Sequence, residues 1–264
     1  MPNVIVLGLT QNPSTGRIVA ATHGRGAFSL SQSEFAVTAP RLTSVVNMAS
    51  LSEGPLSSGM AARLLGSNLA DVTYQPANPF PLPLSLAGAT LTVNDVPAPL
   101  YAVSPTQVDF QVPYDISGSV AQVTLNTSSG SATVRLNLAG ASPGIFHSGE
   151  EANIFHADYL RVSDLAPAQS GEQLVLYASG LGEVSPIVRS GFPATSNPPA
   201  ETVIRPIVRV GGAEAQVVFS GLTPGWIGIY QINFIVPSGV SGRLPLVVDV
   251  GGATSNTVTL SVGP

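Results

Sequence analysis

The sequence predicts an all-β chain of two tandem immunoglobulin-like β-sandwiches, preceded by an N-terminal β-meander. Three observations support this prediction. Short runs alternate apolar and polar residues, turns rich in Gly and Pro separate these runs, and one segment of the first half recurs in the second half. Short strands divided by such turns every ~8–12 residues are typical of β-sandwiches.

The composition excludes several classes of protein. The 264 residues include 27 Gly and 23 Pro, and 44% are hydrophobic while only 9% are charged. Disordered tails and coiled coils need far more charge, so neither fits. The net charge is −5, Lys is absent, and the ten Arg are scattered. The chain therefore lacks the basic stripe that nucleic acid or anionic lipid requires, and we expect neither partner.

Cysteine is absent, which excludes disulfides, thiol catalysis and Cys-ligated zinc. Every apolar run is interrupted before the ~18 residues of a membrane span, so no span is predicted. The N-terminus shows no basic segment followed by an apolar one, so we expect no export signal in this chain.

The strand pattern gives the elements in order. Met60–Leu65 has helical propensity, but Gly59 and Gly66 flank it, and its place in the repeat favours a strand. The other predicted strands are Asn3–Leu9, Arg17–Thr22, Ala89–Asn94, Gln107–Val112, Ala121–Thr127, Ala132–Leu138, Gln173–Ala178, Val203–Val210, Ala215–Phe219, Tyr230–Val236, Pro245–Val250 and Asn256–Val262.

The internal repeat predicts the domains. The segment Gln107–Pro113 recurs as Gln231–Pro237, and upstream Ser58-Gly59 before a strand parallels Ser170-Gly171 before another. We therefore predict a meander over residues 1–36, a first sandwich over 40–138 and a second over 139–264, each sandwich with its own core.

A series of short motifs carries a resemblance across residues 40–264. They include Val45-Val46-Asn47-Met48-Ala49-Ser50, Gly66-Ser67-Asn68-Leu69-Ala70, Pro143-Gly144-Ile145-Phe146, Tyr177-Ala178-Ser179-Gly180-Leu181-Gly182 and Tyr230-Gln231-Ile232-Asn233. This part resembles a C-terminal region of secreted acidobacterial proteins, including those of Solibacter, whose modules look like transcription-factor-type immunoglobulin (IPT/TIG) domains. The resemblance implies a sandwich fold, an extracellular or cell-surface setting, and a binding or spacer role without established catalytic residues.

The first 31 residues resemble something else. Asn3–Leu7 followed by Gly16–Phe28 looks like the last blade of a BNR/sortilin-type β-propeller, a fold found in sialidases and other glycoside hydrolases. The resemblance implies that the chain is the tail of a longer protein. A three-stranded sheet needs a partner for its apolar face, so we expect it to pack on the first sandwich or to self-associate with a second copy.

One segment concentrates ionisable side chains, namely His147, Glu150, Glu151, His156 and Asp158. As a catalytic site, His156 would serve as general base or metal ligand, Asp158 would orient it, and Glu150 or Glu151 would complete the site. His147, His156 and Asp158 could also bind a divalent metal, although their spacing matches no metal motif. A solvated interdomain linker explains the same residues, and we favour it.

Three aromatic residues are candidates for ligand binding. Trp226, the only tryptophan, could stack on a sugar or a peptide, but the apolar residues around it favour a place over the second core. Tyr74 and Phe80 lie in a Pro-rich segment over Tyr74–Leu84, predicted to be extended. We expect that segment to dock on its own domain, or else to offer an apolar edge to a partner.

The leading functional hypothesis is therefore a non-catalytic extracellular binding, adhesion or spacer module, with a carbohydrate or a cell-surface protein as partner. The alternative is a small hydrolase of ester, lactone or similar acyl bonds, acting on a small acyl substrate at the interdomain seam, where pockets tend to form. A weaker alternative is an accessory fragment of a glycoside hydrolase, because no catalytic carboxylate pair is evident.

Overall fold

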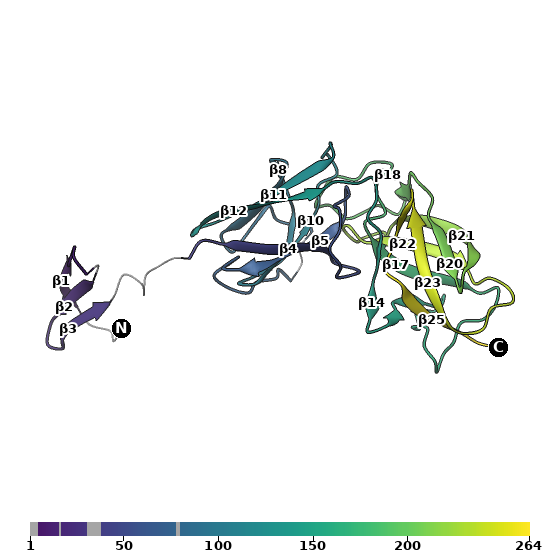
Figure 1. Cartoon of the computed structure of the whole chain (residues 1–264), viewed down its shortest axis with the longest axis horizontal. Helices are drawn as coiled ribbons and strands as arrows, with labels where there is room; N and C mark the ends of the chain where they lie inside the picture. Colours follow the sequence, from purple (N-terminus) through teal and green to yellow (C-terminus); the bar gives the residue numbers. More distant parts are fainter. Residues whose placement is uncertain (1–4, 16, 31–37, 78–79) are drawn as a thin grey trace. The chain divides into compact units, whose positions relative to one another are not determined.

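The computed structural model of the chain describes residues 5–15, 17–30, 38–77 and 80–264. The chain divides into two compact units, residues 1–39 and 40–264 (Figure 1). Regular structure in the described ranges consists of β-strands, which confirms the all-β prediction. Within those ranges no helix is long and apolar enough to cross a membrane.

The first unit is a three-stranded antiparallel meander, as predicted. It contains β1 (Val6–Gln11), β2 (Ile18–Thr22) and β3 (Gly26–Leu30) in the order β1-β2-β3. The predicted residues Asn3 and Val4 lie outside the described residues. Every residue of β1 is exposed, including Leu7 and Leu9 at 64% and 70%, so the described part of the first unit leaves these apolar side chains uncovered.

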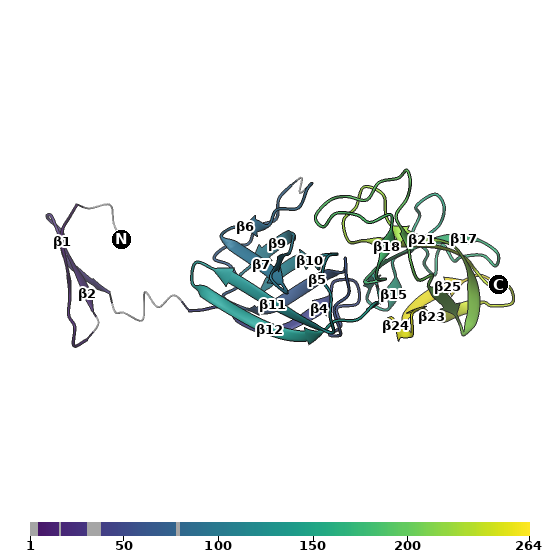
Figure 2. The ribbon, with the colours of Figure 1, turned by 90° about the horizontal axis from the view of Figure 1, so that it is seen from above.

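The first half of the second unit holds two facing sheets (Figure 2). Burial alternates along their strands, as in Ala89–Val93, because alternate side chains point to opposite faces. One sheet has the order β4-β5-β10-β9 and comprises Arg41–Asn47, Ala61–Ser67, Gln107–Gln111 and Leu100–Ser104. The other has the order β12-β11-β7-β6 with β8 beside β7, and comprises Gly130–Asn137, Val120–Thr127, Ala89–Val93, Ser85–Leu86 and Val96–Pro97.

The second half forms one continuous sheet that folds over its own core. Its main path is β13-β17-β22-β21-β20-β23-β25-β15-β14. The long strand β21 (Ala213–Leu222) belongs to both layers, because its start pairs with β20 and its remainder with β22, with a register shift between Val217 and Phe219. The other strands of the path are Gly144–Ile145, Gln173–Ser179, Tyr230–Ile235, Ile207–Val210, Gly242–Val250, Val258–Val262, Glu151–Ala152 and His147–Ser148. Off this path lie β16 (Ile154–Phe155), β18 (Val184–Ser185), β19 (Glu201–Thr202) and β24 (Ala253–Thr254).

Residues 40–264 contain two separate hydrophobic cores. One joins buried residues between Val45 and Leu125, with Phe110 and Met60 among the largest, and the other joins residues between Ala141 and Val262, with Tyr230 and Phe234 at its centre. The predicted division into sandwiches over 40–138 and 139–264 stays a prediction, and the two separate cores support it.

The internal repeat occupies equivalent places in the two sandwiches. Strands β10 and β22 each pair antiparallel with the strand that follows a Ser-Gly turn, β5 and β17 respectively. In both copies a Gln side chain also donates to the residue two positions on. Gln107 donates to Asp109 at 2.9 Å, and Gln231 donates to Asn233 at 2.8 Å.

The strands differ from the sequence-based prediction in several places, and none of the two-residue strands was predicted. The predicted strand Val203–Val210 begins only at Ile207, since Pro206 has no N–H to give to a ladder. Strands β4 and β9 were not predicted at all. β4 ends in three consecutive buried residues and β9 has two half-buried neighbours, so neither alternates cleanly.

Candidate functional site

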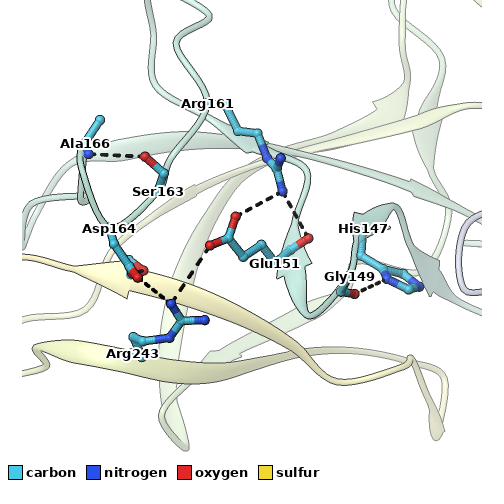
Figure 3. A network of polar contacts seen from close by, with 9 residues as sticks. His147, Gly149, Glu151, Arg161, Ser163, Asp164, Ala166 and Arg243 are labelled. Atoms are coloured by element: carbon cyan, nitrogen blue, oxygen red, sulfur yellow. Dashed lines mark hydrogen bonds and ion pairs between the residues drawn. The ribbon is translucent and has the colours of Figure 1, made fainter.

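The predicted catalytic residues lie on short strands and loops of the second sandwich, and Figure 3 shows two of them, His147 and Glu151. His156 follows β16, and both of its ring nitrogens have partners. Nδ1 lies 2.5 Å from Glu172 Oε1 and Nε2 lies 3.1 Å from the Ala166 carbonyl oxygen. Glu172 therefore orients this imidazole in place of the predicted Asp158. No ring nitrogen is left to act as general base or metal ligand.

The electrostatics of His156 suit a structural cation. Burial by itself lowers the pKa of this imidazole, but the hydrogen bonds to Glu172 and Ala166 and the nearby charges of Glu172 and Asp158 raise the pKa above its usual value overall. The charged ring donates from both nitrogens, because the Ala166 carbonyl can only accept. His156 thus links the segment after β16 to the turn before β17.

Glu151 is part of a separate ion-pair network, which Figure 3 shows. Its carboxylate lies 3.4 Å from Arg161 and 3.9 Å from Arg243, and Arg243 in turn lies 2.5 Å from Asp164. Both oxygens of Glu151 thus face guanidinium groups, and neither faces His156. This network connects the ends of β15 and β23 with the loop before β17.

The remaining predicted residues do not join His156. His147 Nδ1 lies 2.7 Å from the Gly149 carbonyl, Glu150 is exposed, and an Asp158 oxygen accepts from the Leu160 backbone N–H at 3.0 Å. No group of three or more His, Asp or Glu side chains in the described parts of the chain could hold a metal ion. The metal set His147, His156 and Asp158 is thus not assembled.

Two cavities lie between the sandwiches, where the hydrolase alternative needs its site. One of about 620 Å³ is lined by residues such as Pro99, Tyr114 and Ile187, and one of about 340 Å³ by residues such as Asn47 and Ser255. None of the five predicted catalytic residues lines either cavity. The geometry therefore does not support the predicted hydrolase site.

An aromatic pocket of about 290 Å³ lies instead on the second sandwich. We use this term for the six residues that line it, Phe146, Asn153, Phe155, Tyr177, Trp226 and Ile229. The rings of Phe155 and Tyr177 meet edge to face, with centroids 5.7 Å apart and planes at 64°. Burial, and then the nearby Tyr159, raise the pKa of the Tyr177 hydroxyl, so that hydroxyl is neutral at ordinary pH.

The alternation of the strands explains why these rings face outward. Leu174, Leu176 and Ala178 of β17 point into the core, so Tyr177 lies on the opposite face of the strand. Phe155, on the neighbouring strand β16, pairs with Val175 of β17 and therefore lies on the same face as Tyr177. Sequence reasoning missed Phe146, Phe155 and Tyr177, although an aromatic residue at an outward position of a predicted strand is the signal that could have found Tyr177.

Trp226 completes the pocket from a loop. Its side chain is 59% exposed, so the favoured expectation that it covers the second core is wrong. The loop Thr223–Ile229 closes through a bond of 2.9 Å from Thr223 N to the Ile229 oxygen, and Trp226 N donates to the Thr223 oxygen at 3.0 Å. This tight turn leaves the core to Ile227 and presents the indole outward.

Tyr74 and Phe80 lie away from this pocket, on the first sandwich. The main chain of their segment docks on its own domain as expected, with Tyr74 paired to Val103 and Pro83 accepting from Leu100. Leu82 N also donates to the Gly191 oxygen of the second sandwich. The side chains of Tyr74 and Phe80 remain 50% and 56% exposed, and neither lines the aromatic pocket.

Comparisons with known proteins give likenesses in structure only. No family model matches the chain, and no curated protein matches it in sequence. The chain is similar to the protein SGBP-B from a mixed-linkage glucan utilization locus of Bacteroides ovatus. The identity is 14% and the TM-score 0.38, over 94% of this chain and 52% of that one. It is also similar to SGBP-B from a xyloglucan utilization locus of Bacteroides uniformis, at 14% identity and a TM-score of 0.27, over 85% and 50% of the two chains.

A third similar structure is that of domains 5–6 of the S-layer protein SbsC, at 12% identity and a TM-score of 0.29, over 85% of this chain and 99% of that one. The chain spans about half the length of the two SGBP-B proteins. At these identities none of the three identifies a ligand for this chain, and the IPT/TIG and propeller resemblances stay predictions.

Proposed function

We propose that this chain is a non-catalytic extracellular module that binds a neutral carbohydrate in the aromatic pocket of its second sandwich. The observation that carries the proposal is the lining of that pocket, with four aromatic side chains, one aliphatic side chain and one amide. Pockets that bind small molecules are mostly apolar, with a few polar groups that fix orientation.

Aromatic faces suit sugar rings for a physical reason. A pyranose presents C–H groups on one face and hydroxyls at its edge, and an aromatic ring carries negative charge density on its face that attracts the C–H groups. Trp226 offers such a face at the surface, and Phe155 and Tyr177 hold each other in a fixed arrangement beside it. The aromatic pocket thus provides a rigid apolar surface next to water.

One polar group among the lining side chains is the amide of Asn153, beside the Tyr177 hydroxyl and the Trp226 indole N–H. It forms no hydrogen bond with another described residue, so its two donors and its acceptor are available for sugar hydroxyls. None of the six lining residues is charged, which favours a neutral glycan over a uronic acid or a sulfated sugar. At about 290 Å³, the pocket holds a short segment of glycan.

The resemblance of residues 40–264 to a region of secreted proteins supports an extracellular or cell-surface setting. The acyl-hydrolase alternative loses its support, because His156 is engaged at both nitrogens and lies outside both seam cavities. A binding module also accommodates the weaker alternative, in which the chain accompanies a glycoside hydrolase.

The test is titration of the full chain with neutral oligosaccharides of cellulose, mixed-linkage glucan, xyloglucan and mannan, followed by calorimetry. We expect one of them to bind, and Trp226→Ala to weaken binding at least tenfold, since losing an aromatic anchor costs about 2 kcal/mol and ~1.4 kcal/mol is a factor of ten. Tyr74→Ala, an exposed aromatic on the other sandwich, is the matched control. Absence of binding, or equal binding by Trp226→Ala, would contradict the proposal.

A further inference from the structure

The loop that carries Trp226 is held from two sides. From the second sandwich, Ala194 N donates to the Trp226 carbonyl oxygen at 3.0 Å. From the first sandwich, the Tyr101 hydroxyl on β9 donates to the carbonyl oxygen of Ile227 at 2.9 Å. The residue directly after Trp226 is thus fixed by a side chain of the other sandwich.

Tyr101 is suited to hold this contact permanently. Burial, and then the neighbours Tyr114 and Asp109, raise the pKa of its hydroxyl far above the usual value, so the hydroxyl keeps its proton and remains a donor. Gly228 makes the close approach possible. Its φ is +62°, and a Cβ at this position would lie 2.7 Å from the Tyr101 hydroxyl oxygen. Only glycine allows both the backbone angle and the contact.

A second connection acts on the next carbonyl of the same loop. The Ser179 hydroxyl lies 3.4 Å from the Gly228 carbonyl oxygen, and the same hydroxyl accepts from Ala61 N of the first sandwich at 2.8 Å. Two consecutive carbonyls behind Trp226 therefore have partners that belong to the first sandwich or are bonded to it.

We infer that the first sandwich is a working part of the ligand site, with Tyr101 as the positioning residue of the Trp226 loop; this rests on the proposed carbohydrate function. Tyr101 does not line the pocket and acts through the loop alone. A loop fixed in its binding conformation loses less entropy when a ligand arrives, so removing the tether weakens binding without removing a ligand contact.

Trp226 is the only tryptophan, so its fluorescence reports directly on this loop. The experiment compares Tyr101→Phe with the wild type in the full chain, well below the melting temperature. We expect Tyr101→Phe to increase acrylamide quenching of Trp226 in the ligand-free protein and to weaken binding of the best neutral oligosaccharide about three- to tenfold. Thr133→Val, which removes an exposed hydroxyl on β12 of the first sandwich, should change neither. Gly228→Ala, which disturbs the same contact from the loop side, should reproduce both effects.

The two readouts separate this inference from the proposed function. If no neutral oligosaccharide binds the wild type while quenching still rises in Tyr101→Phe, the proposed function fails and the positioning of the loop stands. If quenching and affinity in Tyr101→Phe equal those of the wild type, the positioning role is wrong, whatever binds. Circular dichroism of each variant confirms that the strands are intact, and Gly228→Ala provides the test should Tyr101→Phe fail to fold.

Discussion

The hydroxyl of Ser179, at the end of β17, accepts a 2.8 Å hydrogen bond from the backbone N–H of Ala61, at the start of β5. Both residues are fully buried, and they belong to different sandwiches. The neighbouring Asn47 amide donates to the Ser142 carbonyl at 2.9 Å, and the Ser57 hydroxyl donates to the Gly180 carbonyl at 3.3 Å. The two sandwiches are thus joined by buried polar contacts between backbone and small side chains.

Replacing Ser179 by Ala should destabilise residues 40–264. The change leaves the buried Ala61 N–H without its acceptor, and such a group costs about 1–3 kcal/mol. Urea unfolding followed by circular dichroism measures this loss. Ser170→Ala removes an exposed hydroxyl one strand-length away and should change stability by less than about 0.5 kcal/mol. Equal unfolding midpoints for the two variants would show that the contact contributes nothing.

Gly180→Ala should be more damaging than a comparable glycine change elsewhere. Gly180 has φ +78°, and a Cβ there would lie 2.1 Å from the Ser142 carbonyl oxygen. Gly212 has φ +85° with no atom within 4 Å of its Cβ position, so Gly212→Ala carries the backbone strain without the clash. We expect Gly180→Ala to lose about 1–3 kcal/mol more than Gly212→Ala, the usual cost of overpacking. Equal losses of unfolding free energy in the two variants would rule out a steric clash between position 180 and the Ser142 carbonyl oxygen.

The pair of His156 and Glu172 predicts a specific pH dependence. The pKa of His156 is raised in the folded chain, so its stabilisation is fully present below the unfolded value near 6.5 and is lost as pH rises through the folded pKa. The melting temperature of the wild type should therefore fall across that window, more than in His156→Gln. His147→Gln, a half-buried histidine whose Nδ1 contacts only a carbonyl, is the control and should keep the wild-type slope. If the melting temperature of His156→Gln fell with pH as steeply as that of the wild type, the ion pair between His156 and Glu172 would be refuted.

Binding of a neutral glycan should be insensitive to salt. The residues that line the aromatic pocket carry no charge, so there is no Coulombic attraction for ions to screen. Calorimetry at low and high sodium chloride should give dissociation constants that agree within about twofold. A large loss of affinity in high salt would point to a charged ligand and a different site.

The exposed apolar residues of β1 predict self-association through the meander. Leu7 and Leu9 of β1 and the preceding Ile5 are 64–72% exposed, and an uncovered strand edge invites pairing with another strand. A chain that lacks residues 1–39 should therefore be more monomeric than the full chain in analytical ultracentrifugation. The melting temperature of residues 40–264 should be the same in both proteins. If the deletion leaves the sedimentation profile as it was, the meander plays no part in association.

The sequence by itself determined the fold class and most of the longer strands, because alternation with period two depends only on which face of a strand is buried. The repeat likewise placed β10 and β22 in equivalent positions, since similar local sequences pair with similar neighbours. Strands without clean alternation, such as β4, carried no such signal and emerged only from pairing with β5.

The site was decided by the tertiary structure. Phe155 and Tyr177 come from paired strands, while Trp226 comes from a loop about 50 residues further on, and only pairing of β16 with β17 and closure of the loop bring the rings together. Charge density along the chain pointed to His156 instead, but proximity in sequence does not show which partners a side chain meets. The Nδ1 of His156 pairs with Glu172, sixteen residues away, and Tyr101 of the other sandwich donates to the Trp226 loop. Both contacts depend on the packing of distant segments, which local sequence patterns do not encode.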